Sequence, residues 1–277
     1  MGTSSLYKGP RTSVLLPPDY EDNSAQDGTI QDNSPQDFVP NEGSPEGDNS
    51  NGAIDATPIV TWGSAKSTMT KSYSGGSRQI RNAVKQYTKA LGGYKNAARQ
   101  AVSAKRVTSN VISFFSGSVA DIKTHLEDAG IKFEGRTTSD IFLEIRDVLA
   151  PSPDTLEDSY ANKAVNDTIE EIISDKDFDL VAIDDVLNAD ILERMTCGFI
   201  KYYIYEKLMG QDTLGVVKHE TDPSKIKKFE KILMDCIEGF VMFSVPPLLK
   251  DGMDKKEINV LVNELYETCY KTMEGMK

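Results

Sequence analysis

The sequence predicts an all-α protein in which a multi-helix globular domain follows a long disordered N-terminal leader. Beyond residue 60, apolar residues recur every three or four positions in one segment after another, which is the period of a helix that buries one face. The only strand-like run is 178–183 (FDLVAI), and no second run is available to pair with it. We therefore expect a short helix or turn at that run, within an otherwise helical chain.

The 277-residue chain divides by composition into a leader and a body. Residues 21–60 are rich in Asp, Asn, Ser, Gln, Gly, Pro and Glu, and such a segment buries too little apolar surface to offset the entropy of ordering. We predict a disordered acidic linker there, with a root-mean-square reach of roughly 35 Å. It joins a linear motif at residues 1–20 to a helical domain at residues 61–277, in which basic N-terminal helices (61–116) precede an acidic helical remainder (117–277).

The helical domain is expected to begin with two basic helices. Ser64 could cap the first, short helix, and the neighbouring Trp62 is expected to form a lid over the first helical layer. For the second helix, Ser77 is a candidate cap and Gly92-Gly93 a stop. The apolar positions of this second helix are Ile80, Val84, Tyr87 and Leu91.

The same spacing predicts further helices along the rest of the chain. Val102 and Leu156 are among the apolar positions expected to face the core. Met242 is expected to fill a gap in a buried helix. Four aromatic residues at helical spacing are interpreted as core, namely Phe199, Tyr202, Tyr203 and Tyr205. The expected ranges of these helices are 94–117, 118–130, 137–151, 152–174, 188–210, 222–245 and 254–275.

Charge is distributed unevenly along the chain, whose formal net charge is −12. Residues 61–110 carry ten Lys and Arg side chains and no acidic one, whereas residues 111–277 carry 33 acidic and 19 basic side chains. No carboxylate side chain occurs between Asp55 and Asp121. This asymmetry is the strongest electrostatic signal in the sequence.

Sequence motifs for catalysis, for cofactors and for membranes are missing. No phosphate-binding loop, dinucleotide-binding glycine motif or nucleophile elbow occurs, and His125 and His219 have no partner at a metal-ligand spacing. We expect His125 on a solvated helix face and His219 in a loop. Three widely spaced cysteines favour neither a disulfide framework nor a zinc site, and no apolar run reaches the roughly 18 residues that span a bilayer. We therefore expect a cytoplasmic, non-enzymatic protein with no metal, cofactor or membrane partner.

The basic segment 66–106 supports two interpretations. Its cations could bind nucleic-acid phosphates through counterion release. Alternatively, its helices could dock on an acidic surface, either the chain's own C-terminal half or a partner. We favour docking, because the apolar stripes between the cations need helical neighbours in any case. The candidate residues for both interpretations are Lys66, Lys71, Arg78, Arg81, Lys85, Lys89, Arg99, Lys105 and Arg106.

The first twenty residues, MGTSSLYKGPRTSVLLPPDY, differ in character from the linker that follows. Removal of Met1 would leave the amine of Gly2, and an α-amino group with a pKa near 7.7 to 8.0 is partly neutral, and so nucleophilic, at cytoplasmic pH. Myristoylation is disfavoured because Leu6 stands where its motif requires Ser or Thr. The run LLPP suits capture in a partner's groove as an extended segment, and the alternative is that it folds back on the helical body. The candidate partner-binding residues are Leu15, Leu16, Pro17 and Pro18.

Two blocks, residues 2–18 and 62–93, together resemble a known family. The head with MGTSS, GP and LLPP, a spacer rich in Pro, Gln and Asp, and the block WGSAKSTMTKSYSGGSRQIRNAVKQYTKALGG are similar to the B subunits of the Qat bacterial anti-phage defence system. In that family an aromatic residue often follows LLPP, whereas this chain has Asp19 there.

The resemblance implies a cytoplasmic, non-enzymatic component that works with three partners. These are an ATPase, a TatD-like nuclease and a QueC-like enzyme, which is similar to the deazaguanine-synthesis ligase of the queuosine pathway. The resemblance also implies that the QueC-like enzyme joins a deazaguanine to the N-terminal glycine amine of its protein partner. In this sequence only Gly2 matches that position.

Overall fold

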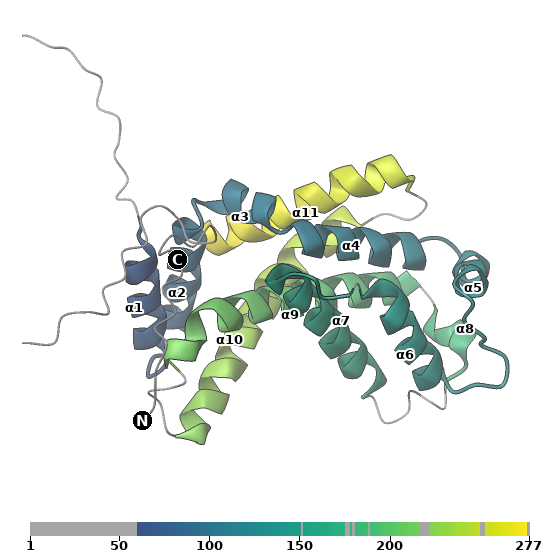
Figure 1. Cartoon of the computed structure of the whole chain (residues 1–277), viewed down its shortest axis with the longest axis horizontal. Coiled ribbons are helices and arrows are strands. Elements are labelled where there is room, and N and C mark those ends of the chain that lie inside the picture. The colour runs from purple at the N-terminus through teal and green to yellow at the C-terminus, as the bar shows by residue number, and fades with distance from the viewer. Residues whose placement is uncertain are drawn as a thin grey trace, which may run out of the picture. The chain divides into compact units, whose positions relative to one another are not determined.

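Helices and their connections make up the part of the chain that the structure describes. The computed structural model describes residues 60–150, 152–174, 178, 181–187, 189–216, 222–249 and 253–275. Every regular element in these ranges is a helix, which confirms the all-α prediction (Figure 1). The elements are α1 (Trp62–Ser72), α2 (Ser77–Ala90), α3 (Tyr94–Gln100), α4 (Val102–Phe115), α5 (Val119–Asp128), α6 (Thr138–Leu149), α7 (Leu156–Ile173), α8 (Ile183–Val186), α9 (Ala189–Val216), α10 (Pro223–Ser244), the 3-10 turn η2 (Pro246–Leu248) and α11 (Lys255–Gly275).

The first two helices begin at residues other than those predicted. Thr61 caps α1, because its hydroxyl oxygen accepts a hydrogen bond from the backbone N–H of Ser64 at 3.3 Å. In α2, Gly76 holds the cap position, and its backbone N–H donates to the side chain of Gln79 at 2.8 Å. Both predicted caps were therefore wrong: Ser64 lies inside α1, and Ser77 is the first residue of α2.

The segment predicted as one helix over residues 94–117 is two helices, α3 and α4. They meet at Ala101, which is buried and has the non-helical dihedral angles φ −79° and ψ 52°. Val102, the first residue of α4 and a predicted core position, is 68% exposed, because it lies on the side of this helix opposite the buried Val111. Leu156, the first residue of α7, is 62% exposed and was also wrongly predicted as core.

The helices α7 and α9 pack along each other (Figure 1). A Cβ atom at Gly198 of α9 would lie 2.8 Å from the Thr168 side chain of α7, so the glycine permits the close approach of the two helices. Phe199 and Tyr203 of α9 are buried, and the other two tyrosines of this aromatic run are half-buried. These burials confirm that the aromatic run belongs to the core.

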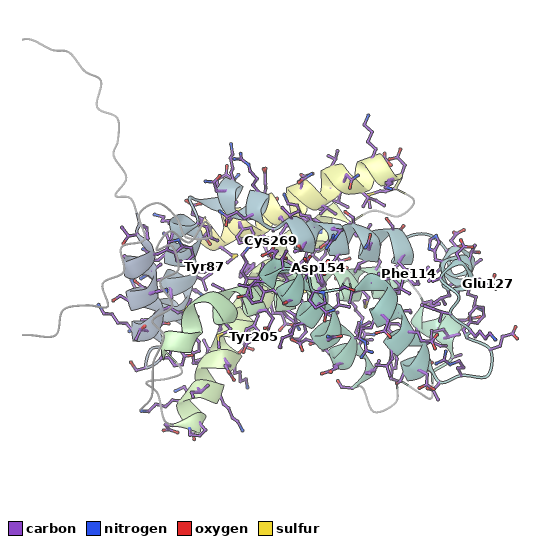
Figure 2. The ribbon with its side chains drawn as sticks, in the orientation of Figure 1. Tyr87, Phe114, Glu127, Asp154, Tyr205 and Cys269 are labelled. Atoms are coloured by element: carbon purple, nitrogen blue, oxygen red, sulfur yellow. The ribbon has the colours of Figure 1, made fainter. Side chains whose placement is uncertain are left out.

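The basic N-terminal helices pack against the C-terminal helices of the same chain. Helix α2 contacts α10 and α11, and α4 contacts α7, α9 and α11. Thr108 of α4 and Tyr266 of α11, both buried, are joined by a hydrogen bond between their hydroxyl groups at 3.0 Å. Tyr87 of α2 and Cys269 of α11, labelled in Figure 2, are also buried. The apolar stripes of the basic helices therefore have helical neighbours within the chain.

The C-terminal part of α10 is less buried than predicted. Phe240 and Val241 are buried, but Met242 is 47% exposed and Phe243 is 75% exposed. Met242 therefore does not fill a gap in a buried helix. The prediction was wrong because α10 presents only one side to its neighbours, and these two residues lie on the other side.

Several predictions concern residues outside the described ranges. These are the linear motif at residues 1–20, nearly all of the linker at residues 21–60, and His219. Within the described ranges, no helix is long and apolar enough to cross a membrane.

Candidate functional site

The cations predicted to bind a partner do not share one set of surroundings. Lys71 and Arg78 are exposed and Lys89 is half-exposed, and within the described ranges the side chains of these three residues form no hydrogen bond or ion pair. Arg99, on α3, is exposed and donates only to Asn96 of the same helix, at 3.4 Å, among the contacts that the structure describes. These side chains of α1 to α3 therefore remain available to a partner.

Other cations of α1 and α2 interact with the chain itself. Arg81 lies beside Cys236 of α10, where burial raises the pKa of the thiol and the nearby guanidinium opposes that rise. Lys66 and Lys85 also interact with other groups of the chain. Docking on the chain's own C-terminal half thus involves some of the predicted cations and not others.

Arg106, near the middle of α4, contacts the acidic half of the chain directly. Its Nη2 atom lies 2.7 Å from Oδ1 of Asp158 in α7, and Asp158 is 6% exposed. The same carboxylate accepts hydrogen bonds from the hydroxyl groups of Ser103 and Thr155, each at 2.7 Å. These hydrogen bonds, with a smaller contribution from Arg106, hold the pKa of Asp158 below its ordinary value. Asp158 therefore joins α4 to the first turn of α7.

Lys105, the neighbouring cation, reaches α11 instead. Its Nζ atom donates to Oδ1 of Asn263 at 2.9 Å, and the Asn263 amide nitrogen donates to the backbone oxygen of Asn259 at 2.8 Å. Burial lowers the pKa of Lys105, and the nearby carboxylate of Glu267 opposes that effect only in part. This ammonium group is thus a partly desolvated cation whose hydrogen-bond acceptor is neutral.

Lys105 and Arg106 line a hollow of about 370 Å³ between α4 and α11, and Lys255 completes it. Lys255 could not be singled out from the sequence, because it lies in the acidic remainder where no local run of charge marks it. Only the packing of α11 beside α4 brings the three cations together.

A second hollow, of about 250 Å³, lies where α7, α9 and α10 meet. Lys201 lines it, and its Nζ atom lies 2.7 Å from both carboxylate oxygens of Glu171. Cys197 lines it too, but burial raises the pKa of this thiol to about 12, which leaves it protonated and a poor nucleophile at neutral pH. Glu193, Arg194 and Glu238 also line the hollow, so the Lys201–Glu171 pair neutralises only part of its charge.

His125 was predicted to lie on a solvated helix face, but it is half-buried. Its Nδ1 atom lies 2.9 Å from the backbone oxygen of Phe114, and because a carbonyl can only accept, Nδ1 carries the proton. Among the described residues, no group of three or more His, Cys, Asp and Glu side chains could hold a metal ion. The predicted leader sites, Gly2 and the residues Leu15, Leu16, Pro17 and Pro18, lie outside the described ranges.

The fold and the charge distribution define the class of protein. This is an all-α protein in which a basic set of N-terminal helices packs on an acidic helical half. Residues 92–273 match the family model of Qat anti-phage system associated protein QatB, and the chain belongs to this family. It is therefore a component of the Qat anti-phage defence system, and other components of that system are its partners.

The family match rests on a different part of the chain from the resemblance described above. It begins at Gly92, where the second of the two blocks (62–93) is ending, so it includes α3 to α11 but neither α1 nor α2. Comparisons with curated proteins and with solved structures found no match.

Proposed function

We propose that this protein is a non-enzymatic adaptor of the Qat system and the substrate of an N-terminal modification. In this proposal, the QueC-like partner joins a deazaguanine to the α-amine of Gly2 after Met1 has been removed. The helical body meanwhile binds other partners of the system, among them the ATPase and the TatD-like nuclease. The observation that carries the proposal is Gly2 itself, at the head of a chain that belongs to the QatB family.

Physical arguments support the choice of this amine. An α-amine with a pKa near 7.7 to 8.0 is neutral in a sizeable fraction of molecules at pH 7, whereas a lysine amine with a pKa near 10.4 is almost wholly protonated. Glycine also has no side chain to obstruct an enzyme pocket. The acidic linker, residues 21–60, would let the amine reach a partner's active site over roughly 35 Å.

Intact mass spectrometry tests the modification. The chain is co-expressed with the QueC-like partner, and peptide mapping locates any adduct. We expect an adduct on the des-Met chain, at Gly2, which disappears in Gly2→Ala and with a catalytically dead partner. Thr3→Ala is the matched control, because it alters the neighbouring residue and keeps the glycine amine. A measured mass equal to that of the unmodified des-Met chain, with an active partner present, would contradict the proposal.

The run LLPP has its own test within the same proposal. We expect the double variant Leu15→Ala, Leu16→Ala to slow adduct formation, because a docking peptide raises the local concentration of the amine at the enzyme. Pull-down of the QueC-like partner measures the docking directly. Equal rates of adduct formation for this variant and the wild type would show that LLPP is not a docking peptide for that enzyme.

Nucleic-acid binding by the segment 66–106 is a second candidate function. The exposed cations Lys71 and Arg78 favour it, because no carboxylate of α1 or α2 neutralises them. Fluorescence anisotropy with labelled DNA and RNA tests this function. For duplex DNA the logarithm of affinity should fall with the logarithm of salt concentration by about 0.9 for each phosphate contacted.

The control for the second candidate uses cations elsewhere on the surface. We expect the double variant Lys71→Gln, Arg78→Gln to reduce the salt slope, and Lys227→Gln, Lys228→Gln on α10 to leave it unchanged. If no nucleic acid binds, docking on an acidic surface of a Qat partner is the better explanation of these cations.

A further inference from the structure

The hollow between α4 and α11 has the lining of an anion site. Three of its side chains are cationic, namely Lys105, Arg106 and Lys255, and no acidic side chain lines it. The rest of the lining is mainly polar and includes the side chains of Asn110 and Asn259. Two of these cations, Lys105 and Arg106, belong to the basic segment, and the packing of α11 adds Lys255 from residues 111–277, where acidic residues outnumber basic ones 33 to 19.

The hydrogen bonds within the chain leave donors for a ligand. Arg106 uses one amino group on Asp158, and a guanidinium carries five N–H donors. Lys105 donates to the neutral amide oxygen of Asn263, and an ammonium carries three donors. Lys255 is exposed at the start of α11 and has no ion pair in the described residues.

We propose that this hollow binds a phosphate group. An oxyanion here could accept charge-assisted hydrogen bonds from the two lysines and the arginine. Because Arg106 already pairs with Asp158, the positive charge left for a ligand is about +2, close in size to the charge of a phosphate at neutral pH. The burial that lowers the pKa of Lys105 supports this assignment, because the ammonium group has lost solvent without gaining a carboxylate at hydrogen-bond distance.

A neighbouring hollow gives room for the rest of the ligand. The two hollows share Asn110 and Lys255, and the second is also lined by Ser113 and Ser116. Its one carboxylate, Asp121, accepts hydrogen bonds from the cap residue Ser118 and would repel a phosphate. The phosphate is therefore placed in the first hollow, beside Lys105 and Lys255. The side chains of Asn110, Ser113 and Ser116 in the second hollow would contact the remainder of the ligand. The ligand class is a phosphate-bearing one, either a mononucleotide or a nucleic-acid strand.

This site is independent of the modification proposed at Gly2, and it uses cations other than Lys71 and Arg78. Its test is a binding assay on the full chain with three probes: inorganic phosphate, a fluorescent adenine mononucleotide and a 5′-phosphorylated single-stranded DNA. The mononucleotide and the strand distinguish the two sources of the phosphate. Inorganic phosphate, as a competitor, shows whether the phosphate group itself is recognised.

The discriminating variants are neighbours on α11. Lys255→Gln removes a lining cation, and Lys256→Gln removes the same charge one residue later, where the side chain lines a different hollow. Both lysines are exposed, so both variants should fold normally. We expect Lys255→Gln to weaken binding about tenfold and Lys105→Gln to do the same or more, while Lys256→Gln changes it less than twofold.

Two outcomes would overturn the proposal. One is that no probe binds the wild type with a dissociation constant below about 1 mM. The other is that Lys255→Gln and Lys256→Gln weaken binding equally, which would make the effect one of net charge. A loss confined to Lys71→Gln, Arg78→Gln would assign the phosphate contact to α1 and α2 and would also overturn the proposal.

Discussion

Both ends of the basic segment carry cations and no carboxylate, but the two ends have different surroundings. In α1 and α2, Lys71 and Arg78 lie exposed with no ion pair in the described part of the chain. In α4, Arg106 contacts the buried carboxylate of Asp158, and Lys105 contacts Asn263. The difference shows that cations close together in the sequence need not lie on one surface of the folded protein. The direction in which each side chain leaves its helix, and the packing of that helix, decide which cations contact the rest of the chain.

The largest expected effect comes from the packing that joins the two regions. Ile112 of α4 is fully buried, so Ile112→Ala should lower the free energy of unfolding by about 2–5 kcal/mol through lost apolar burial and a cavity. Because α4 contacts α7, α9 and α11, we expect one cooperative unfolding transition at a lower temperature. Circular dichroism follows this transition through the loss of helix, and tryptophan fluorescence follows it through Trp62 in α1.

The control for this variant lies on the same helix. Val102 is 68% exposed, so Val102→Ala should change the stability by less than about 0.5 kcal/mol. If Ile112→Ala separated the two probes into two transitions, the basic helices would unfold apart from the acidic half, contrary to the packing described here.

The second prediction concerns the Asp158 carboxylate that Arg106 contacts. Asp158→Asn should destabilise the protein at neutral pH, because the hydrogen bonds from Ser103 and Thr155 and the ion pair favour the ionised form. The pKa of Asp158 is lowered on folding, so its contribution is fully present above the unfolded value near 3.9 and is lost as pH falls through the folded value.

Thermal unfolding of the wild type and of Asp158→Asn at a series of pH values tests whether the pKa of Asp158 is lowered on folding. The difference in melting temperature between the wild type and Asp158→Asn should stay constant from about pH 7 to 5 and close only below about pH 4. The exposed Asp147, changed to Asn, is the matched control. A difference that already closed between pH 7 and 5 would mean that the pKa of Asp158 is raised, not lowered.

The helical fold could be predicted from periodicity, but the helix ends could not. The spacing of Ile80, Val84 and Tyr87 places one face of α2 in the core, and all three are buried. Val102 was also assigned to the core but is exposed, because the break at Ala101 starts a separate helix, α4, in which Val102 lies on the side opposite the buried Val111. The dihedral angles at one buried alanine depend on the helices around it, and no local motif marks them.

The candidate phosphate site could be predicted from the sequence even less well than the helix ends. The sequence identified Lys105 and Arg106 as cations, yet it indicated neither Asn263 nor Lys255 as their neighbours. Lys105 and Asn263 lie 158 residues apart, and only the packing of α4 beside α11 joins them. A charge pattern read along the chain can find residues that bind anions, but not the hollow that they line.

The third prediction addresses the hydrogen bond that joins α4 to α11 inside the core. Tyr266→Phe removes the hydroxyl that pairs with Thr108, and the loss of one buried neutral hydrogen bond should lower the stability by about 1 kcal/mol. The double variant Thr108→Val, Tyr266→Phe removes both partners and leaves no unpaired group. It should be closer to the wild type than the sum of the two single variants. Strict additivity would show that the two hydroxyl groups do not interact.

The smallest expected effect comes from the outward cations, and it tests whether they remain available to a partner. Lys71 lies in the last turn of α1, where its charge interacts favourably with the negative end of the helix dipole. Lys71→Gln should therefore lower the stability by only about 0.3–0.5 kcal/mol in dilute buffer and by less at high salt, which screens an exposed charge. A loss of stability above about 1 kcal/mol that persisted at high salt would mean that Lys71 makes a stabilising contact within the fold, as Arg106 does with Asp158. A small, salt-sensitive loss would show that its charge contributes little to stability and is free to act in binding.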